Sequence, residues 1–128
     1  MLIRPLLALC AMLLLGIPTY GADCPVERNG DAISAAIEKA PTCAAAYNTF
    51  QACAYIASID TMFGGLVTEK CEKGFLTKLS PAQTKTYERE KDACSKKYAN
   101  KEGTMYRSFE ATCISKLAVG YSKRFGGK

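Results

Sequence analysis

The spacing of the cysteines constrains this chain more than any other feature. Of seven cysteines, Cys10 lies in an apolar N-terminal run, and residues 22–128 contain the other six: Cys24, Cys43, Cys53, Cys71, Cys94 and Cys113. Zinc sites, iron–sulfur sites and thiol oxidoreductases typically use closely spaced C-x-x-C pairs, and this chain has none. An even set of well-spaced cysteines therefore predicts three structural disulfides, formed in an oxidising compartment, and no metal site.

Residues 1–21 have the residue order of a secretory signal peptide. Arg4 precedes an apolar run from Leu6 to Leu15, and Gly16, Pro18 and small residues follow. The run is too short for a membrane-spanning helix, which needs roughly 18 to 20 apolar residues. We expect cleavage after Gly21, one domain over residues 22–128 with no transmembrane segment, and a periplasmic or secreted location.

Hydrophobic periodicity predicts an all-α fold. Apolar residues recur at three- and four-residue steps, and no segment combines strand-like alternation with hairpin turn pairs. We expect a small antiparallel bundle of four to five helices, over residues 32–39, from about 42 to the pair Gly64-Gly65, over 66–79, from 80 towards 103, and from 104 to about 125. A capping box of Ser80 and Gln83, with Pro81 between them, should begin the fourth helix.

Two further features of these helices are expected from local chemistry. Asp31 should cap the first helix, and Thr104 should cap the last, because short polar side chains satisfy free backbone N–H groups. The buried seam of the last helix should consist of the apolar residues at four-residue steps, which are Met105, Phe109, Cys113, Leu117 and Tyr121.

Helix geometry limits the disulfide pairings. Cys43 and Cys53 on one helix would stand about 15 Å apart, beyond the reach of a disulfide. A hairpin that turns near residues 102–104 brings Cys94 level with Cys113. The same reasoning about a turn at Gly64-Gly65 pairs Cys53 with Cys71, which leaves Cys24 for Cys43.

Enzymatic chemistry finds little support in the sequence. The chain has no histidine, which excludes Ser-His-Asp and Cys-His catalysis and histidine-ligated metals. Glu88 and Asp92 share a helix face and could form an acid–base pair. Both should be exposed, however, and neighbouring lysines and Arg89 should keep them ionised. We expect no catalytic residue, no cofactor and a binding protein rather than an enzyme.

Charge is unevenly distributed. Residues 23–79 carry a net charge of −2, whereas residues 80–128 carry +6. A solvated helix face explains much of this excess. An anionic envelope surface, lipid or wall polymer, is the alternative partner for the basic half, through Lys85, Arg89, Lys96, Lys97, Lys101, Arg107, Lys123 and Arg124. Nucleic acid is not expected, because the chain has no aromatic-interleaved recognition motif.

The carboxyl half contains a spaced motif that starts at an aromatic residue, Tyr87. Lys91-Asp92-Ala93-Cys94, Glu102-Gly103-Thr104 and Cys113-Ile114 follow it. This pattern resembles the LprI-like lysozyme-inhibitor family of exported bacterial proteins over residues 80–125, with weaker correspondence at Cys43, Cys53 and Asp60. The family's usual tryptophan, arginine and first glycine are Tyr87, Lys91 and Glu102 here, and a lysine cannot reproduce the two-pronged grip of an arginine on a carboxylate.

The resemblance implies a helical, disulfide-linked exported protein that inhibits lysozyme by steric occlusion of its cleft. It also implies binding roles for the matched residues Tyr87, Lys91, Asp92, Gly103 and Thr104. Animal-type lysozymes are generally basic, so such a partner requires acidic residues gathered on one patch. Residues of the first third are the candidates for that patch: Asp23, Glu27, Asp31 and Glu38.

Overall fold

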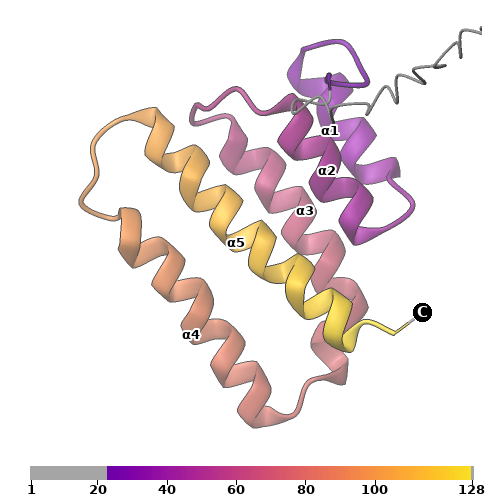
Figure 1. Ribbon diagram of the computed structural model, residues 1–128, viewed down its shortest axis with the longest axis vertical. Helices are drawn as coiled ribbons and strands as arrows, with labels where there is room; N and C mark the ends of the chain where they lie inside the picture. Colours follow the sequence, from indigo (N-terminus) through magenta and orange to yellow (C-terminus); the bar gives the residue numbers. More distant parts are fainter. Residues whose placement is uncertain (1–22, 128) are drawn as a thin grey trace, which may run out of the picture.

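The structure is a computed structural model that describes residues 23–127, so the expected signal peptide and its cleavage site lie outside the described residues. All regular structure within residues 23–127 is helical, which confirms the all-α prediction (Figure 1). The elements are α1 (Gly30–Lys39), α2 (Cys43–Cys53), α3 (Asp60–Phe75), the 3-10 turn η1 (Leu76–Lys78), α4 (Pro81–Tyr98) and α5 (Thr104–Phe125).

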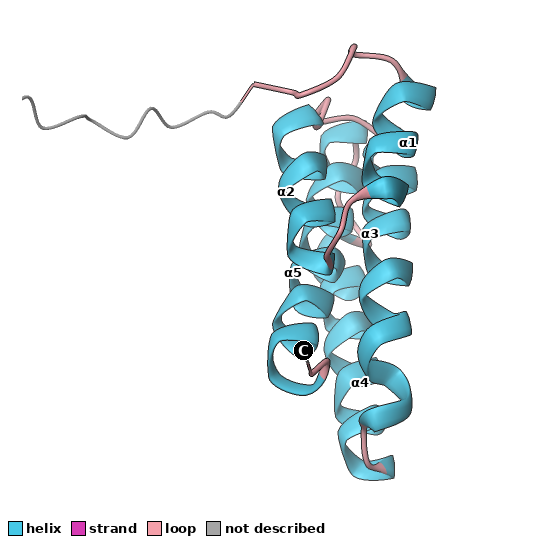
Figure 2. Ribbon diagram, turned by 90° about the vertical axis from the view of Figure 1, so that its right-hand side faces the viewer, coloured by secondary structure: helices cyan, strands magenta, loops and turns pink. Residues whose placement is uncertain are grey.

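Consecutive helices run antiparallel, as predicted, so alternate helices run parallel (Figure 2). At the beginning of α3 and α5, the Ser108 hydroxyl donates to the Asp60 carboxylate at 2.6 Å. At their far ends, the rings of Phe75 and Tyr121 lie 5.7 Å apart. A Cβ atom on Gly30 would lie 3.7 Å from Ile59, which places the start of α1 beside the start of α3. Helices α1, α3 and α5 therefore begin at one end of the bundle.

The helix starts follow local capping chemistry. The complete Ser80–Gln83 capping box begins α4 with Pro81 in its first turn, as predicted. The cap of α1 is Asn29 rather than Asp31, since the Asn29 side chain accepts from Ala32 N–H at 2.8 Å. Gly103, with a φ of 111°, occupies the cap position of α5, and Thr104 is already helical. The predicted cap at Asp31 is therefore wrong by two residues, and the predicted cap at Thr104 is wrong by one. At the start of α5, the backbone conformation of Gly103 takes the place of a side-chain cap.

The predicted helix break at Gly64-Gly65 is wrong. Helix α2 ends at Cys53, and α3 begins at Asp60 and continues through both glycines. Gly64 packs so closely against α5 that a Cβ atom there would lie 2.9 Å from the Ala111 Cβ. The glycine therefore serves helix packing, and the chain turns instead at residues 54–59.

The shifted turn explains the disulfides. The predicted Cys94–Cys113 bond is present, but the predicted partners of the other four cysteines are wrong. The observed bonds are Cys24–Cys53 and Cys43–Cys71. With the turn at residues 54–59, Cys53 lies beside the turn, whereas Cys71 lies about 16 Å along α3 and meets the opposite end of α2. The three disulfides indicate an oxidising environment.

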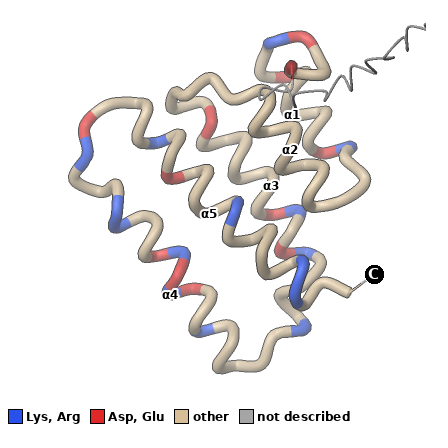
Figure 3. The backbone as a smooth tube through the Cα atoms, in the orientation of Figure 1, with Lys and Arg blue, Asp and Glu red and all other residues tan. Residues whose placement is uncertain are grey.

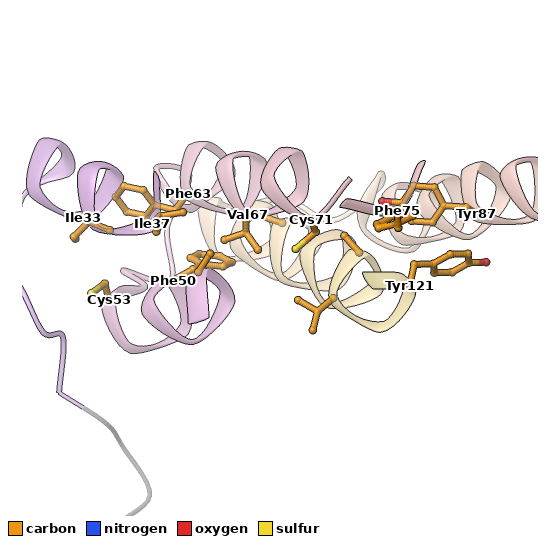
Figure 4. Close-up of a cluster of buried hydrophobic side chains, with 14 residues drawn as sticks. Ile33, Ile37, Phe50, Cys53, Phe63, Val67, Cys71, Phe75, Tyr87 and Tyr121 are labelled. Atoms are coloured by element: carbon orange, nitrogen blue, oxygen red, sulfur yellow. The ribbon is translucent and has the colours of Figure 1, made fainter. Parts of the chain in front are cut away.

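The core joins all five helices along the length of the bundle. Figure 4 shows Phe50 and Val67 in its middle, with Phe63 beside Ile37 towards one extremity and Phe75 and Tyr87 at the other. The predicted seam of α5 is only partly correct, because Tyr121 is buried and Cys113 and Leu117 are half-buried, while Met105 and Phe109 are exposed. Small residues face the core instead, because α5 packs closely against α3: Ser108, Ala111, Ser115 and Ala118.

Candidate functional site

Two of the five residues assigned a role by the family resemblance meet at one carboxylate. Tyr87 is fully buried, and its hydroxyl donates to Glu72 Oε1 at 2.8 Å. Lys91 Nζ lies 2.9 Å from the same oxygen. Burial, followed by the hydrogen bond and charge of Glu72, raises the pKa of Tyr87 far above its usual value of 10.0. Burial alone would lower the pKa of Lys91, but the hydrogen bonds and charges of Glu72 and Glu88 raise it.

The other three residues lie apart from this carboxylate. Asp92 is exposed and pairs with Lys96 at 2.6 Å on the outer face of α4. Gly103 and Thr104 lie in and just after the α4–α5 connection. Along α4, the end of the helix at Tyr98 is about 16 Å from Tyr87. The five residues therefore do not converge on one pocket, and the Tyr87–Glu72–Lys91 group joins α4 to α3.

The carboxylates considered for acid–base chemistry are paired with cations. Glu88 lies 3.6 Å from Lys91, and Asp92 lies 2.6 Å from Lys96. Within residues 23–127, no group of three or more cysteine, aspartate or glutamate side chains is arranged to hold a metal ion. No helix within the same residues is long and apolar enough to span a membrane.

A buried aspartate organises the connection between α2 and α3. Asp60 is fully buried, and its carboxylate accepts hydrogen bonds from the backbone N–H groups of Tyr55 at 3.0 Å, Ile56 at 2.8 Å and Ala57 at 3.4 Å. The Ser108 hydroxyl of α5 donates to the same carboxylate. A carboxylate that accepts several N–H bonds fixes a turn strongly, because each donor would otherwise be left unpaired. We call residues 54–59 the Asp60 loop.

The Asp60 loop holds Ile56 in a backbone conformation that isoleucine rarely adopts. Ile56 has a φ of 57°, in the left-handed region, and no other non-glycine residue among those described has a positive φ. A β-branched side chain there costs on the order of 1 to 2 kcal/mol. Ile56 is nevertheless 50% exposed, so burial of its side chain does not offset that cost. A strained and exposed apolar side chain on a fixed loop is typical of a functional surface.

All large apolar side chains classed as exposed within residues 23–127 lie at the same end of the bundle. They come from the Asp60 loop and from the first two turns of α3 and α5, which the Ser108–Asp60 hydrogen bond holds together. We call this surface the apolar end, and its members are Tyr55, Ile56, Ile59, Met62, Met105 and Phe109. Grouped exposed apolar side chains mark interaction sites more often than scattered ones do.

Acidic side chains flank the apolar end. Asp23 precedes Cys24, which the disulfide to Cys53 fixes beside the Asp60 loop. Asp31 follows Gly30 at the start of α1, next to Ile59. Glu27 belongs to the same N-terminal segment, in which Arg28 donates to Ala52 O at 3.2 Å. Glu38 lies at the other end of α1, where its carbonyl oxygen accepts from Lys70. Three of the four predicted acidic residues therefore gather at one end.

The basic residues of the carboxyl half are spread along the molecule rather than gathered (Figure 3). Lys101 lies in the α4–α5 connection, whereas Lys123 and Arg124 lie in the last turn of α5. Lys96 pairs with Asp92, and Arg107 pairs with Glu110 at 2.7 Å. Within residues 23–127, the other six basic residues proposed for anion binding form no ion pair: Lys85, Arg89, Lys97, Lys101, Lys123 and Arg124.

The surface also has hollows beside α5. One of about 450 Å³ lies between α3 and α5, with Gly64, Gly65 and Ala111 in its lining and Glu69, Glu72 and Glu110 among the charged residues around it. All three glutamates are paired with a cation, at distances of 2.7 to 3.0 Å. A second hollow, of about 310 Å³, lies between α2 and α5.

Sequence reasoning missed the apolar end because it placed residues 54–57 in a buried helix. The alanine and aromatic spacing before residue 58 continues the helical pattern of α2. The signal that could have revealed the loop is Asp60, an acidic residue directly after an almost wholly apolar stretch, in a position to cap a turn.

Comparison with known proteins gives no further guide. No family model matches the chain, and no curated protein or solved structure matches it. The function is therefore inferred from the residues of this chain.

Proposed function

We propose that the chain is an exported binding protein that docks a protein partner through its apolar end. The partner we propose is a lysozyme-type enzyme, whose cleft the Asp60 loop would block by steric occlusion, in the periplasm or outside the cell. The observation that carries this proposal is the strained, exposed Ile56 on a loop that the buried Asp60 carboxylate fixes.

A fixed loop favours binding because little conformational entropy is lost on association. Three backbone hydrogen bonds to Asp60 and the Cys24–Cys53 disulfide already order the Asp60 loop. The apolar side chains on it are then free to enter a partner's pocket. Aromatic and aliphatic anchors in a desolvated centre carry most of the energy of typical protein interfaces.

Charge at the apolar end supports a basic partner. Asp23, Glu27 and Asp31 are exposed around the loop, with Arg28 as the basic residue of the same segment. The net charge of the whole chain is +5, which would repel a basic enzyme at long range. The acidic flank supplies a local attraction that would orient such a partner towards the loop.

The proposal is tested by titrating the oxidised protein, residues 22–128, into several lysozymes that clear a cell-wall suspension. The variant Ile56→Asn/Met62→Gln removes two apolar anchors, and asparagine suits the left-handed conformation at residue 56. Thr77→Asn, at an exposed position in η1, is the matched control.

We expect inhibition at near-stoichiometric dose, at least a tenfold loss in the Ile56→Asn/Met62→Gln variant and no loss in Thr77→Asn. Thermal unfolding should show that both variants are folded, with the double variant at least as stable as the wild type because asparagine relieves the backbone strain at residue 56. Absence of inhibition of every lysozyme at large molar excess would overturn the enzyme assignment. Equal inhibition by the double variant would show that the apolar end is not the docking surface.

A second candidate function is docking of the basic carboxyl half on an anionic envelope surface. The observation that favours it is the set of lysines and arginines on α4 and α5 that form no ion pair within residues 23–127, among them Lys85, Arg89 and Lys123. It predicts binding to anionic vesicles that weakens as salt is added. Absent or salt-independent binding would eliminate it.

A further inference from the structure

The hollow between α2 and α5 has charges of one sign. Its lining comprises Ala44, Tyr47 and Asn48 from α2 and Lys116, Val119, Gly120 and Lys123 from α5. Helix α2 contains no charged residue, and the only acidic residue of α5 is Glu110, which pairs with Arg107. We call this hollow the α2–α5 cleft.

The two lysines of the cleft are spaced along one face of α5. Lys123 follows Lys116 by seven positions, which corresponds to two helical turns and a rise of about 10 Å. Both are exposed, and neither forms an ion pair within residues 23–127. They present two cations that a ligand with repeated acidic groups can contact together.

The floor of the cleft between the lysines is open at Gly120. A Cβ atom on Gly120 would meet nothing within 4 Å, and Gly120 lies inside α5, four residues after Lys116 and three before Lys123. Close helix packing, as at Gly64, does not occur at Gly120. The absence of a side chain there leaves the space between the two lysines free for a ligand.

The opposite wall offers neutral polar groups and an aromatic ring. Tyr47 is half-buried, and within residues 23–127 its hydroxyl forms no hydrogen bond to another protein group. Its phenol is protonated at neutral pH and can donate a hydrogen bond, and burial raises the pKa of Tyr47 further. The Asn48 amide beside it can both donate and accept. An aromatic ring, an amide and a phenol are groups that contact the hydroxyls and faces of sugar rings.

We propose that the α2–α5 cleft binds a segment of an acidic polysaccharide, with Lys116 and Lys123 contacting two acidic groups and Tyr47 and Asn48 contacting the sugar between them. The shared ligand chemistry is a sugar chain with carboxylate or sulfate groups about 10 Å apart. This site uses a different face from the apolar end, so it does not depend on docking there. It shares Lys123 with the second candidate function, which it narrows to one cleft and one ligand class.

Calorimetric titration of the oxidised protein tests this proposal with three hexasaccharides. Oligogalacturonate supplies carboxylates, a heparin-derived hexasaccharide supplies sulfates, and maltohexaose is the neutral control. Gly120→Leu fills the cleft while both lysines remain, and Lys116→Gln/Lys123→Gln removes the charges. The matched control, Lys39→Gln/Lys73→Gln, removes the same charge from exposed positions in the last turns of α1 and α3. Circular dichroism and thermal unfolding establish that each variant is folded.

We expect binding of at least one acidic hexasaccharide and none of maltohexaose. Both cleft variants should weaken it at least tenfold, and the Lys39→Gln/Lys73→Gln control should weaken it less than twofold. An equal loss in that control would show diffuse attraction and overturn the proposal. Unchanged binding in folded Gly120→Leu would place the ligand elsewhere.

Two further outcomes complete the test. Binding of anionic vesicles without binding of either acidic hexasaccharide would overturn the saccharide assignment in favour of a lipid surface. The Ile56→Asn/Met62→Gln variant should bind the hexasaccharide as the wild type does. The two proposals can therefore fail separately.

Discussion

The two ends of the bundle use aromatic and aliphatic side chains in opposite ways. At the end where α3 stops and α4 begins, Phe75 and Tyr121 enclose Tyr87, with ring centroids 5.1 and 4.7 Å from that of Tyr87. We call this group the aromatic end. At the apolar end, a buried carboxylate satisfies the backbone, and the six large apolar side chains remain 36% to 50% exposed. Packing thus stabilises one end, whereas hydrogen bonding fixes the other and leaves its large side chains partly exposed.

The largest expected effect comes from breaking the hydrogen bonds that hold the apolar end. Asp60→Ala leaves three backbone N–H groups and the Ser108 hydroxyl without their acceptor. We expect a loss of about 3 to 5 kcal/mol in the free energy of unfolding, since unpaired buried donors cost on the order of 1 to 3 kcal/mol each and water will reach some of them. Urea unfolding followed by circular dichroism measures the loss.

Asp92→Asn is the control for this prediction, because Asp92 is exposed and its only described partner is Lys96 on the surface. It should leave the urea midpoint unchanged. A small effect of Asp60→Ala, similar to that of the control, would contradict the role assigned to the buried carboxylate.

The disulfides lie at different distances from the Asp60 loop. Replacing Cys24 and Cys53 with serine frees the N-terminal segment beside that loop, whereas replacing Cys43 and Cys71 frees the opposite end of α2 from α3. Each pair should cost about 2 to 4 kcal/mol. Partner binding at the apolar end should weaken mainly in the Cys24→Ser/Cys53→Ser protein, as an inhibition or pull-down titration would measure. Equal weakening by both pairs would contradict the localisation of the site.

Peptide mapping of the unreduced protein checks the pairing on which that prediction rests. It should find Cys24 joined to Cys53, Cys43 to Cys71 and Cys94 to Cys113. Recovery of Cys53 joined to Cys71 would contradict the turn at residues 54–59.

The comparison of the ends also shows what local sequence can predict. The α4–α5 hairpin could be predicted, because the Ser80–Gln83 capping box and the spacing of Cys94 and Cys113 are local patterns with direct structural meanings. The apolar end could not be predicted, because its turn depends on the Asp60 carboxylate and on Ser108, which lies 48 positions away in sequence. The pair Gly64-Gly65 likewise predicted a helix break, and only the close contact of Gly64 with Ala111 of α5 shows why α3 continues through it.

The candidate sites show the same limit. The family resemblance pointed to Tyr87 and Lys91, which the fold uses to join α4 to Glu72 of α3. Ile56 could not be identified from the chain, because neither its positive φ nor its exposure follows from its neighbours in sequence. The sequence predicted that the acidic residues of the first third gather on one patch. Three of them lie at the apolar end, whereas Glu38 lies at the other end of α1.

Two adjacent glycines of α3, Gly64 and Gly65, differ in how closely α5 packs against them. A Cβ atom on Gly64 would press on Ala111 at 2.9 Å, whereas one on Gly65 would meet nothing within 4 Å. Gly64→Ala should therefore lower the free energy of unfolding by about 1 to 3 kcal/mol, since it forces α3 and α5 apart. Gly65→Ala should raise it by about 0.5 to 1 kcal/mol, through helix propensity alone.

The measurement is the urea midpoint of both proteins in one buffer. The two substitutions add the same methyl group one residue apart, so each is the control for the other. Effects of the same sign would contradict the close packing of α3 against α5.

The smallest effect concerns the aromatic end and depends on pH. The pKa of Tyr87 is raised by burial and by Glu72, and the pKa of Tyr121 is raised by burial and by its hydrogen bond to Glu90. A raised folded-state pKa means that the folded protein holds the phenol proton more tightly than the unfolded chain does. The stabilisation is therefore complete below the unfolded pKa of about 10 and is lost as the pH rises above it.

Tyr87→Phe isolates this contribution because it keeps the ring and removes the hydroxyl. At pH 7 it should cost about 0.5 to 1.5 kcal/mol, the usual net value of one hydrogen bond. Above pH 10 the wild type should lose up to about 1.4 kcal/mol per pH unit for each such tyrosine, and the variant should lose less. Urea midpoints between pH 7 and pH 11.5 measure both slopes. Parallel slopes would mean that Tyr87 ionises as readily in the folded protein as in the unfolded chain, which its contact with Glu72 does not allow.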